Sequence, residues 1–133
     1  MKYPLIELRK AYYDALNTVL PVCDGQVTSG TQSSNYIVLG EAVMIPQKDK
    51  SNFFNEVVLT IDVVNKTYNT GYKEVSEFVN DVTAIINQDT LLTMPSFVMD
   101  NQVIEDMHDF NNLNDKEKVF RTIIRVRSYI TEK

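Results

Sequence analysis

Apolar side chains near the N-terminus recur every three or four residues, which is the spacing of one face of an α-helix. The stripe follows Pro4, a residue that suits the first turn of a helix, and Pro21 blocks continuation beyond Leu20. We therefore predict an amphipathic helix over residues 4–20, with its apolar stripe in the core. The members of the stripe are Leu5, Leu8, Tyr12, Ala15, Leu16 and Val19.

A second stripe of the same spacing predicts a helix from about Tyr72 to Asn87. Asn69 or Thr70 can cap its N-terminus, and Glu74 and Glu77 suit the positive end of the helix dipole. The positions expected to be buried are Val75, Phe78, Val79, Val82, Ile85 and Ile86.

Four runs rich in β-branched and aromatic residues predict strands. The first two runs form a long antiparallel hairpin in which Gly40 marks a bulge or a close backbone contact, and the third is interrupted near Asp100 and Asn101. A further short strand near Val22 is optional. The four runs are residues 36–45, 53–65, 97–110 and 119–130.

Polar segments with turn-forming residues separate these elements. Residues 24–35 and 44–55 are expected to be flexible and to become ordered only on assembly, and residues 111–117 form a polar loop. The chain of 133 residues is of the usual size for one domain, 1–133. We predict the α+β class, with a small antiparallel (mixed) sheet of about four to five strands flanked by two helices.

Composition and charge narrow the function classes. The net charge of −5 argues against tight binding of nucleic acid, which needs clustered Lys and Arg. The stretch between Lys2 and Glu7 is too short for the apolar region of a signal peptide, and no apolar run approaches the ~18–20 residues of a membrane span. A single cysteine, Cys23, excludes an internal disulfide and favours a reducing compartment.

Candidate catalytic and metal-binding residues are few. Glu105, Asp106 and His108 lie in the segment EDMHD, but strand alternation puts Glu105 on the face opposite Asp106 and His108, which leaves an incomplete ligand set for zinc. Cys23 and His108 could in principle serve as nucleophile and base, yet no motif orders them. We predict no enzyme activity, no metal site and no cofactor; a metal-dependent enzyme built on EDMHD is the alternative.

The last strand carries a basic stripe. Alternation places Arg121, Arg125 and Arg127 on one face, where they either remain solvated or bind carboxylates of a neighbouring subunit. Binding of nucleic acid through this stripe is a third alternative, although no basic loops accompany it. Asp62 shares its face with Glu56, opposite a fully apolar face, and can pair with an arginine of a neighbouring strand or of another subunit. We predict an interface role for these five residues.

Three quoted stretches carry a resemblance to a known family. The chain reads LIELRKAYYDALNTVLPVCDGQV, then NYIVLGEAV, then EVVLTIDVVNKTYNTGYKEVSEFVNDVTAIIN. Their order and spacing, from Leu5 to about Tyr129, resemble the tail-completion (tail-terminator) family of tailed bacteriophages.

This resemblance implies a structural virion protein at the head–tail junction, without catalytic residues. It would form a ring, usually a hexamer, that ends assembly of the tail tube and joins the tail to the head connector or portal-associated proteins. DNA would pass through the lumen without specific binding, and assembly would take place in the host cytoplasm. Two alternatives remain: a ring with higher symmetry, such as a dodecamer, in a short-tail barrel, and a small ligand-binding module with a groove between helix 72–87 and the sheet.

Overall fold

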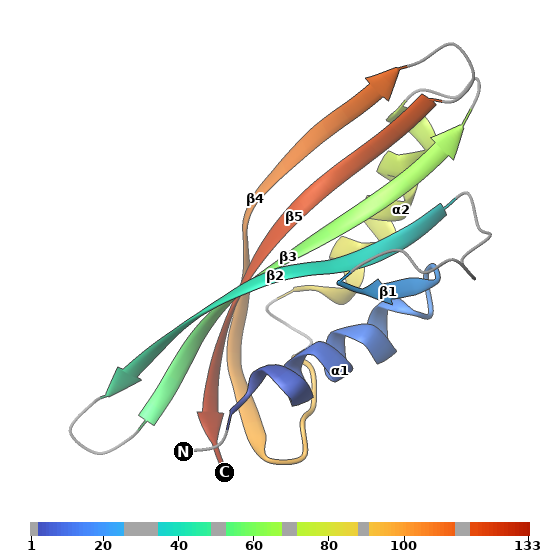
Figure 1. Ribbon diagram of the computed structural model, residues 1–133. Coiled ribbons are helices and arrows are strands. Elements are labelled where there is room, and N and C mark those ends of the chain that lie inside the picture. The colour runs from blue at the N-terminus through green and yellow to red at the C-terminus, as the bar shows by residue number, and fades with distance from the viewer. Residues whose placement is uncertain (1–2, 26–34, 49–52, 68–71, 88–90, 114–117) are drawn as a thin grey trace.

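Two helices pack on one face of a five-stranded mixed sheet, which confirms the predicted α+β class (Figure 1). The computed structural model describes residues 3–25, 35–48, 53–67, 72–87, 91–113 and 118–133. The elements are α1 (Leu5–Leu16), β1 (Val22–Asp24), β2 (Asn35–Lys48), β3 (Phe53–Thr67), α2 (Tyr72–Ile85), β4 (Phe97–Leu113) and β5 (Lys118–Glu132).

The strands lie in the order β1-β2-β3-β5-β4, so that β3 is central and the long strand β4 forms one edge (Figure 1). The optional strand near Val22 is present as β1, which pairs parallel with β2 over only three residues of each strand. All other neighbouring strands pair antiparallel. Because β5 inserts between β3 and β4, it touches the central strand on one side and the edge strand on the other.

The core lies between the two helices and the facing side of the sheet. Alternate residues of β3, such as Val57, Leu59 and Ile61, are buried in this core. Leu8 of α1 and Val82 of α2 belong to the same core from the helix layer. Full burial of each such side chain stabilises the fold by about 1.5–3 kcal/mol. Both helices lie on this side, so within the described ranges no helix covers the opposite side of the sheet, which we call the open face.

The first helix ends earlier than predicted, at Leu16 instead of Leu20. Just after the helix, the Thr18 hydroxyl donates a hydrogen bond to the Ala15 carbonyl at 2.7 Å. This side-chain bond satisfies a carbonyl of the last turn. Leu20 precedes a proline and is therefore biased away from helical geometry. The second helix ends at Ile85, two residues before the predicted end.

The strands are longer than predicted. Residues 44–48 and 53–55, expected to be flexible, belong to the β2–β3 hairpin, and residues 111–113 continue β4. The expectation failed because polar residues can extend a strand wherever a partner strand satisfies their backbone groups. The end of β2 pairs with the start of β3, and β5 runs beside β3 and β4 over nearly their whole lengths. Residues 26–34 and 49–52, and the predicted caps Asn69 and Thr70, lie outside the described residues.

Gly40 lies at an irregularity of β2, as predicted. The register with β3 shifts between Leu39 and Ala42, and a Cβ atom on Gly40 would lie 3.3 Å from the Thr60 carbonyl oxygen. Arg9 of α1 donates to the Gly40 carbonyl at 2.8 Å and, through Nη1, to Asp24 at 3.0 Å. The bulge therefore also presents the carbonyl that anchors the first helix to the sheet.

A buried polar network joins the helices to the two last strands. The Tyr12 hydroxyl donates to Gln102 Oε1 at 2.9 Å and lies 2.8 Å from Ser128 Oγ. The Gln102 amide in turn donates to the Asn87 carbonyl at 2.7 Å, just after α2. Burial raises the pKa of Tyr12 to about 12, against a smaller opposing effect of the Ser128 hydrogen bond, so the phenol is neutral at pH 7.

Candidate assembly surface

The five charged residues predicted as an interface all lie on the open face. Asp62 and Glu56 alternate on β3 with core residues, and the register pairs these outward positions of β3 with outward positions of β5. The three arginines alternate in the same way with the buried side chains of β5. The prediction that Arg121, Arg125 and Arg127 share one face is confirmed.

Arg127 is held between two carboxylates from two different strands. Its Nη1 atom lies 2.6 Å from Glu56 Oε2 of β3, and its Nε atom donates to Glu105 Oε1 of β4. The hydrogen bond with Arg127 lowers the pKa of Glu105, and the same bond raises the pKa of Arg127. Arg127 therefore links β3, β5 and β4 across the open face, and its side chain is only 25% exposed.

Arg125 and Arg121 also pair with carboxylates within the chain, but their side chains are more exposed than that of Arg127. Arg125 lies 3.3 Å from Asp106 and 3.6 Å from Glu105, while Arg121 Nη2 lies 2.8 Å from Asp62. The side chains of these two arginines remain 48% and 43% exposed. They are paired, but solvent still reaches their guanidinium groups.

Asp62 is more enclosed than its arginine partner. Desolvation raises the pKa of the Asp62 carboxyl, and the charge and hydrogen bond of Arg121 oppose this rise only in part. Of the two kinds of partner predicted for Asp62, the structure shows the arginine of a neighbouring strand. Asp62 Oδ1 and Arg121 Nε are both shielded from solvent and have no hydrogen-bond partner among the described residues.

Large apolar side chains are exposed around these ion pairs. Val43 pairs in register with Val58, and Phe110 with Arg121, so both lie on the open face. Ile45 and Val98 share this face by the same register. All four are exposed, with Val43 reaching 58%. Exposed apolar side chains next to arginines are common at protein–protein contact surfaces.

Glu105 lies on a different face of β4 from the one that strand alternation predicted. The register of β4 with β5 shifts between Ile104 and Asp106, so Glu105 is an extra residue in a bulge. It therefore joins Asp106 near Arg125 instead of lying on the opposite face, which corrects the expectation from the sequence. The predicted break near Asp100 corresponds to a similar shift between Met99 and Asn101.

The segment EDMHD binds arginines in this structure. Glu105 and Asp106 are engaged by Arg127 and Arg125, and His108 Nε2 lies 4.0 Å from Asp106. Within the described residues, no group of three His, Cys, Asp or Glu side chains is arranged to hold a metal ion. Cys23 is buried on β1 and His108 lies on β4, so they occupy opposite edges of the sheet.

Shallow hollows lie beside α2. One, of about 320 Å³, lies between the helix and the last two strands, where Ser76 and Val79 face Met107, Asp109 and Thr122. Thr122 donates to Asp109 across its floor at 2.7 Å. This hollow coincides with the groove predicted for a ligand-binding module.

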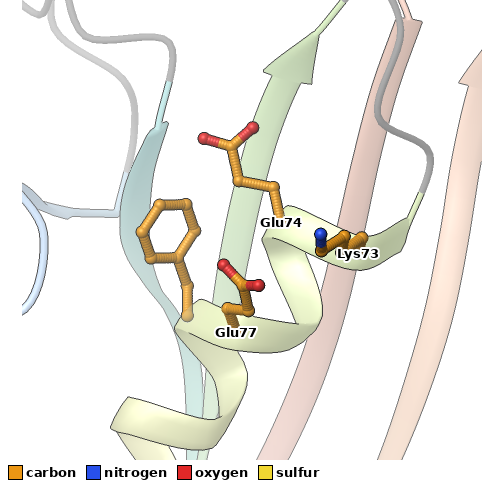
Figure 2. A pocket seen from close by; sticks show the side chains of 4 residues that line it. Lys73, Glu74 and Glu77 are labelled. Carbon is orange, nitrogen blue, oxygen red and sulfur yellow. The ribbon is translucent and has the colours of Figure 1, made fainter.

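A second hollow, of about 300 Å³, lies on the outer surface of α2 itself. It is lined by Lys73, Glu74, Glu77 and Phe78. Figure 2 shows the Glu74 and Glu77 carboxylates on the same side of the helix, with the Lys73 ammonium apart from both. The surface of α2 is therefore acidic on this side.

Comparison with solved structures shows the fold. A chain from a structure described as the virion of a native gene transfer agent particle is similar over 100% of both chains, with a TM-score of 0.75 and 14% sequence identity. A second solved structure, which carries no functional description, has a TM-score of 0.56 at 14% identity and covers 97% of this chain and 95% of its own.

No protein-family model and no curated protein matches the sequence. Across the described part of the chain, none of the helices has the length and apolar character needed to cross a bilayer.

Proposed function

We propose that this chain is a structural virion protein that forms a ring at the head–tail junction or at the top of a tail. The observation that carries the proposal is the similarity of fold, over the full length of both chains, to a chain from a gene transfer agent virion. The order of the sequence motifs, which resembles that of tail-completion proteins, supports the same role independently. The chain would have no catalytic role.

The open face supports an assembly function. Ring closure requires that one surface of a subunit bind a different surface of its neighbour. Half-exposed Arg121 and Arg125, with exposed Phe110 opposite Arg121 and exposed Val43 elsewhere on the same face, provide one such surface. We propose that Asp62 positions Arg121, and that Glu56 and Arg127 brace the strands beneath the contact.

The partners of the ring would be the tail-tube protein on one side and the head connector or portal-associated proteins on the other. We propose a hexamer, located in the neck or tail of the virion and assembled in the host cytoplasm. The net charge of −5 suits a ring whose lumen DNA must pass through without sticking.

Native mass spectrometry, with light scattering as a second method, tests the proposal on the purified chain alone and with tail-tube protein. We expect a closed ring that forms or becomes more stable when tail tubes are present, and that then binds the connector. A count of twelve subunits without tube binding would instead favour the short-tail barrel. A chain that stays monomeric and binds neither partner would contradict the proposal.

The hollow between α2, β4 and β5 favours a second candidate, a small ligand-binding module. Its volume of about 320 Å³ is at the small end of the range for ligand pockets, and it combines the polar Asp109 with the apolar Val79 and Met107. A thermal-shift screen against metabolites separates the two functions, because a bound ligand would raise the unfolding temperature.

A further inference from the structure

Two of the three arginines on the open face combine unused N–H donors with a side chain that is nearly half exposed. Arg127 uses Nε and Nη1 on two carboxylates and is 25% exposed. Arg121 and Arg125 are 43% and 48% exposed. A guanidinium carries five N–H donors, and the ion pairs found here use Nη2 of Arg121 and Nε and Nη2 of Arg125. Both side chains can therefore bind further carboxylates from outside the subunit.

The complementary surface lies on the other layer of the molecule. Glu77 and Asp81 are four residues apart on α2, so their side chains lie on one side of the helix, and both are exposed. Among the described residues, no Lys or Arg lies within 4.0 Å of either carboxylate. Figure 2 shows that Lys73, at helical spacing from Glu77, does not approach it. Like charges at this spacing repel each other mildly.

The two charged rows differ in length by an amount that long side chains can bridge. Glu77 and Asp81 are about 6 Å apart along the helix axis at ~1.5 Å per residue. Arg121 and Arg125 are about 13 Å apart along their strand at ~3.3 Å per residue. Long arginine side chains can accommodate the remaining difference. An α2 helix laid along β5 would thus bring carboxylates within reach of both guanidinium groups.

We propose that Arg121 and Arg125 of one copy bind the acidic side of α2, carrying Glu77 and Asp81, in the next copy of the ring. This inference rests on the ring proposed above and specifies its contact. The open face and α2 belong to opposite layers, so a subunit cannot make the contact with itself (Figure 1). Each copy offers both surfaces once, which is the heterologous arrangement that a closed ring needs.

Charge reversal with rescue tests the contact. Arg125→Glu and Asp81→Lys are each expected to raise the dissociation constant of the ring by at least about tenfold, because each removes an interfacial ion pair and leaves like charges opposed. The double variant Arg125→Glu/Asp81→Lys restores opposite charges between neighbours and should assemble within about threefold of the unmodified chain. Rescue identifies the contact as intermolecular, because the two residues lie on opposite layers.

Matched reversals on α1 provide the control. Lys10→Glu and Asp14→Lys change exposed charges by the same amount away from both surfaces and should leave assembly unchanged. Circular dichroism and thermal unfolding confirm that every variant is folded. Single variants that assemble normally, or a double variant that is no better than its parents, would overturn the inference while the ring itself stands. If the unmodified chain forms no ring with tail tubes, the proposed function fails, and this contact fails with it.

Discussion

At the scale of single residues, the polar side chains of this protein divide into two groups by their surroundings. Tyr12, Gln102 and Ser128 are buried, and the Tyr12 hydroxyl is hydrogen-bonded to both of the other side chains inside the core. The charged residues of the open face are paired but remain in contact with water, so their pairs contribute less to stability and more to recognition.

Tyr12→Phe tests the buried network. The substitution keeps the ring but removes the hydroxyl, leaving Gln102 Oε1 and Ser128 Oγ without that partner. We expect the free energy of unfolding to fall by about 1–3 kcal/mol, measured by urea denaturation at pH 7. Tyr13→Phe, at the exposed neighbouring tyrosine, is the control and should change it by less than ~0.5 kcal/mol. Equal effects of the two substitutions would contradict a stabilising role of the network.

Asp62 and Glu105 are expected to affect the pH dependence of stability in opposite directions. The raised pKa of Asp62 means that the folded state binds more protons than the unfolded state, so this group's contribution declines as pH rises above 3.8. The lowered pKa of Glu105 means the reverse, so its contribution is complete above pH 4.5 and is lost as pH falls.

Urea denaturation of Asp62→Asn and Glu105→Gln between pH 3 and pH 7, about the range in which carboxylates titrate, measures both effects. As pH rises, the unmodified chain should lose stability relative to Asp62→Asn and gain stability relative to Glu105→Gln. Asp62→Asn is also expected to leave the fold intact and at most to weaken assembly, because Arg121 remains accessible to water. If the difference in stability between the unmodified chain and its variant changes with pH in the same direction in both comparisons, the environment of one carboxyl is wrongly described.

At the scale of elements, bulges decide how the strands of the sheet meet their neighbours. The bulge at Gly40 allows β2 to follow β3 closely and presents the carbonyl that binds Arg9 of α1. The bulge at Glu105 turns an extra carboxylate toward Arg127 and interrupts the regular edge of β4. Irregular edge strands resist uncontrolled pairing with other chains, so assembly is directed to the faces of the subunit.

Gly40→Ala tests the first bulge. The added Cβ would lie 3.3 Å from a backbone oxygen of the central strand, which can yield only by shifting β2 or β3. We expect a loss of about 1–2 kcal/mol in the free energy of unfolding. Glu41→Ala, at the exposed next residue, is the control and should have little effect. An unchanged Gly40→Ala variant would show that the close approach to Thr60 is not a constraint.

At the scale of the whole molecule, the layers place different surfaces on opposite sides. One side of the sheet carries ion pairs and exposed apolar side chains, and the other carries the two helices, of which α2 has an acidic surface. Such a two-sided subunit is suited to head-to-tail contacts, in which each copy uses one surface to bind the other surface of its neighbour. The overall negative charge disfavours contacts with nucleic acid on either side.

This charge balance predicts that the assembled protein does not retain DNA. In fluorescence anisotropy at about 150 mM salt, a labelled duplex should show no binding at micromolar protein, because the net charge is −5 and carboxylates flank each of the open-face arginines. Asp62→Asn frees one arginine and serves as a comparison that should bind no more than weakly. Tight, salt-sensitive binding of the unmodified chain would contradict passage of DNA without specific contact.

The local sequence determined the type of nearly every element and the face on which its side chains lie. The spacing of Leu8 and Tyr12 indicated a helix, and alternation placed Asp62 and Arg121 on the side of the sheet away from the core. These features depend on periods of 3.6 and 2 residues, which are properties of a single segment. The resemblance of motif order also came from the sequence alone.

Only the tertiary structure decided which carboxylate each arginine binds. Strand order places β5 between β3 and β4, and this brings Glu56 and Glu105 to Arg127 from opposite sides. The extra residue at Glu105 shifts the register by one, and a shift of one residue moves a side chain to the other face. Pairing across strands depends on register between segments far apart in the chain, which no local period specifies.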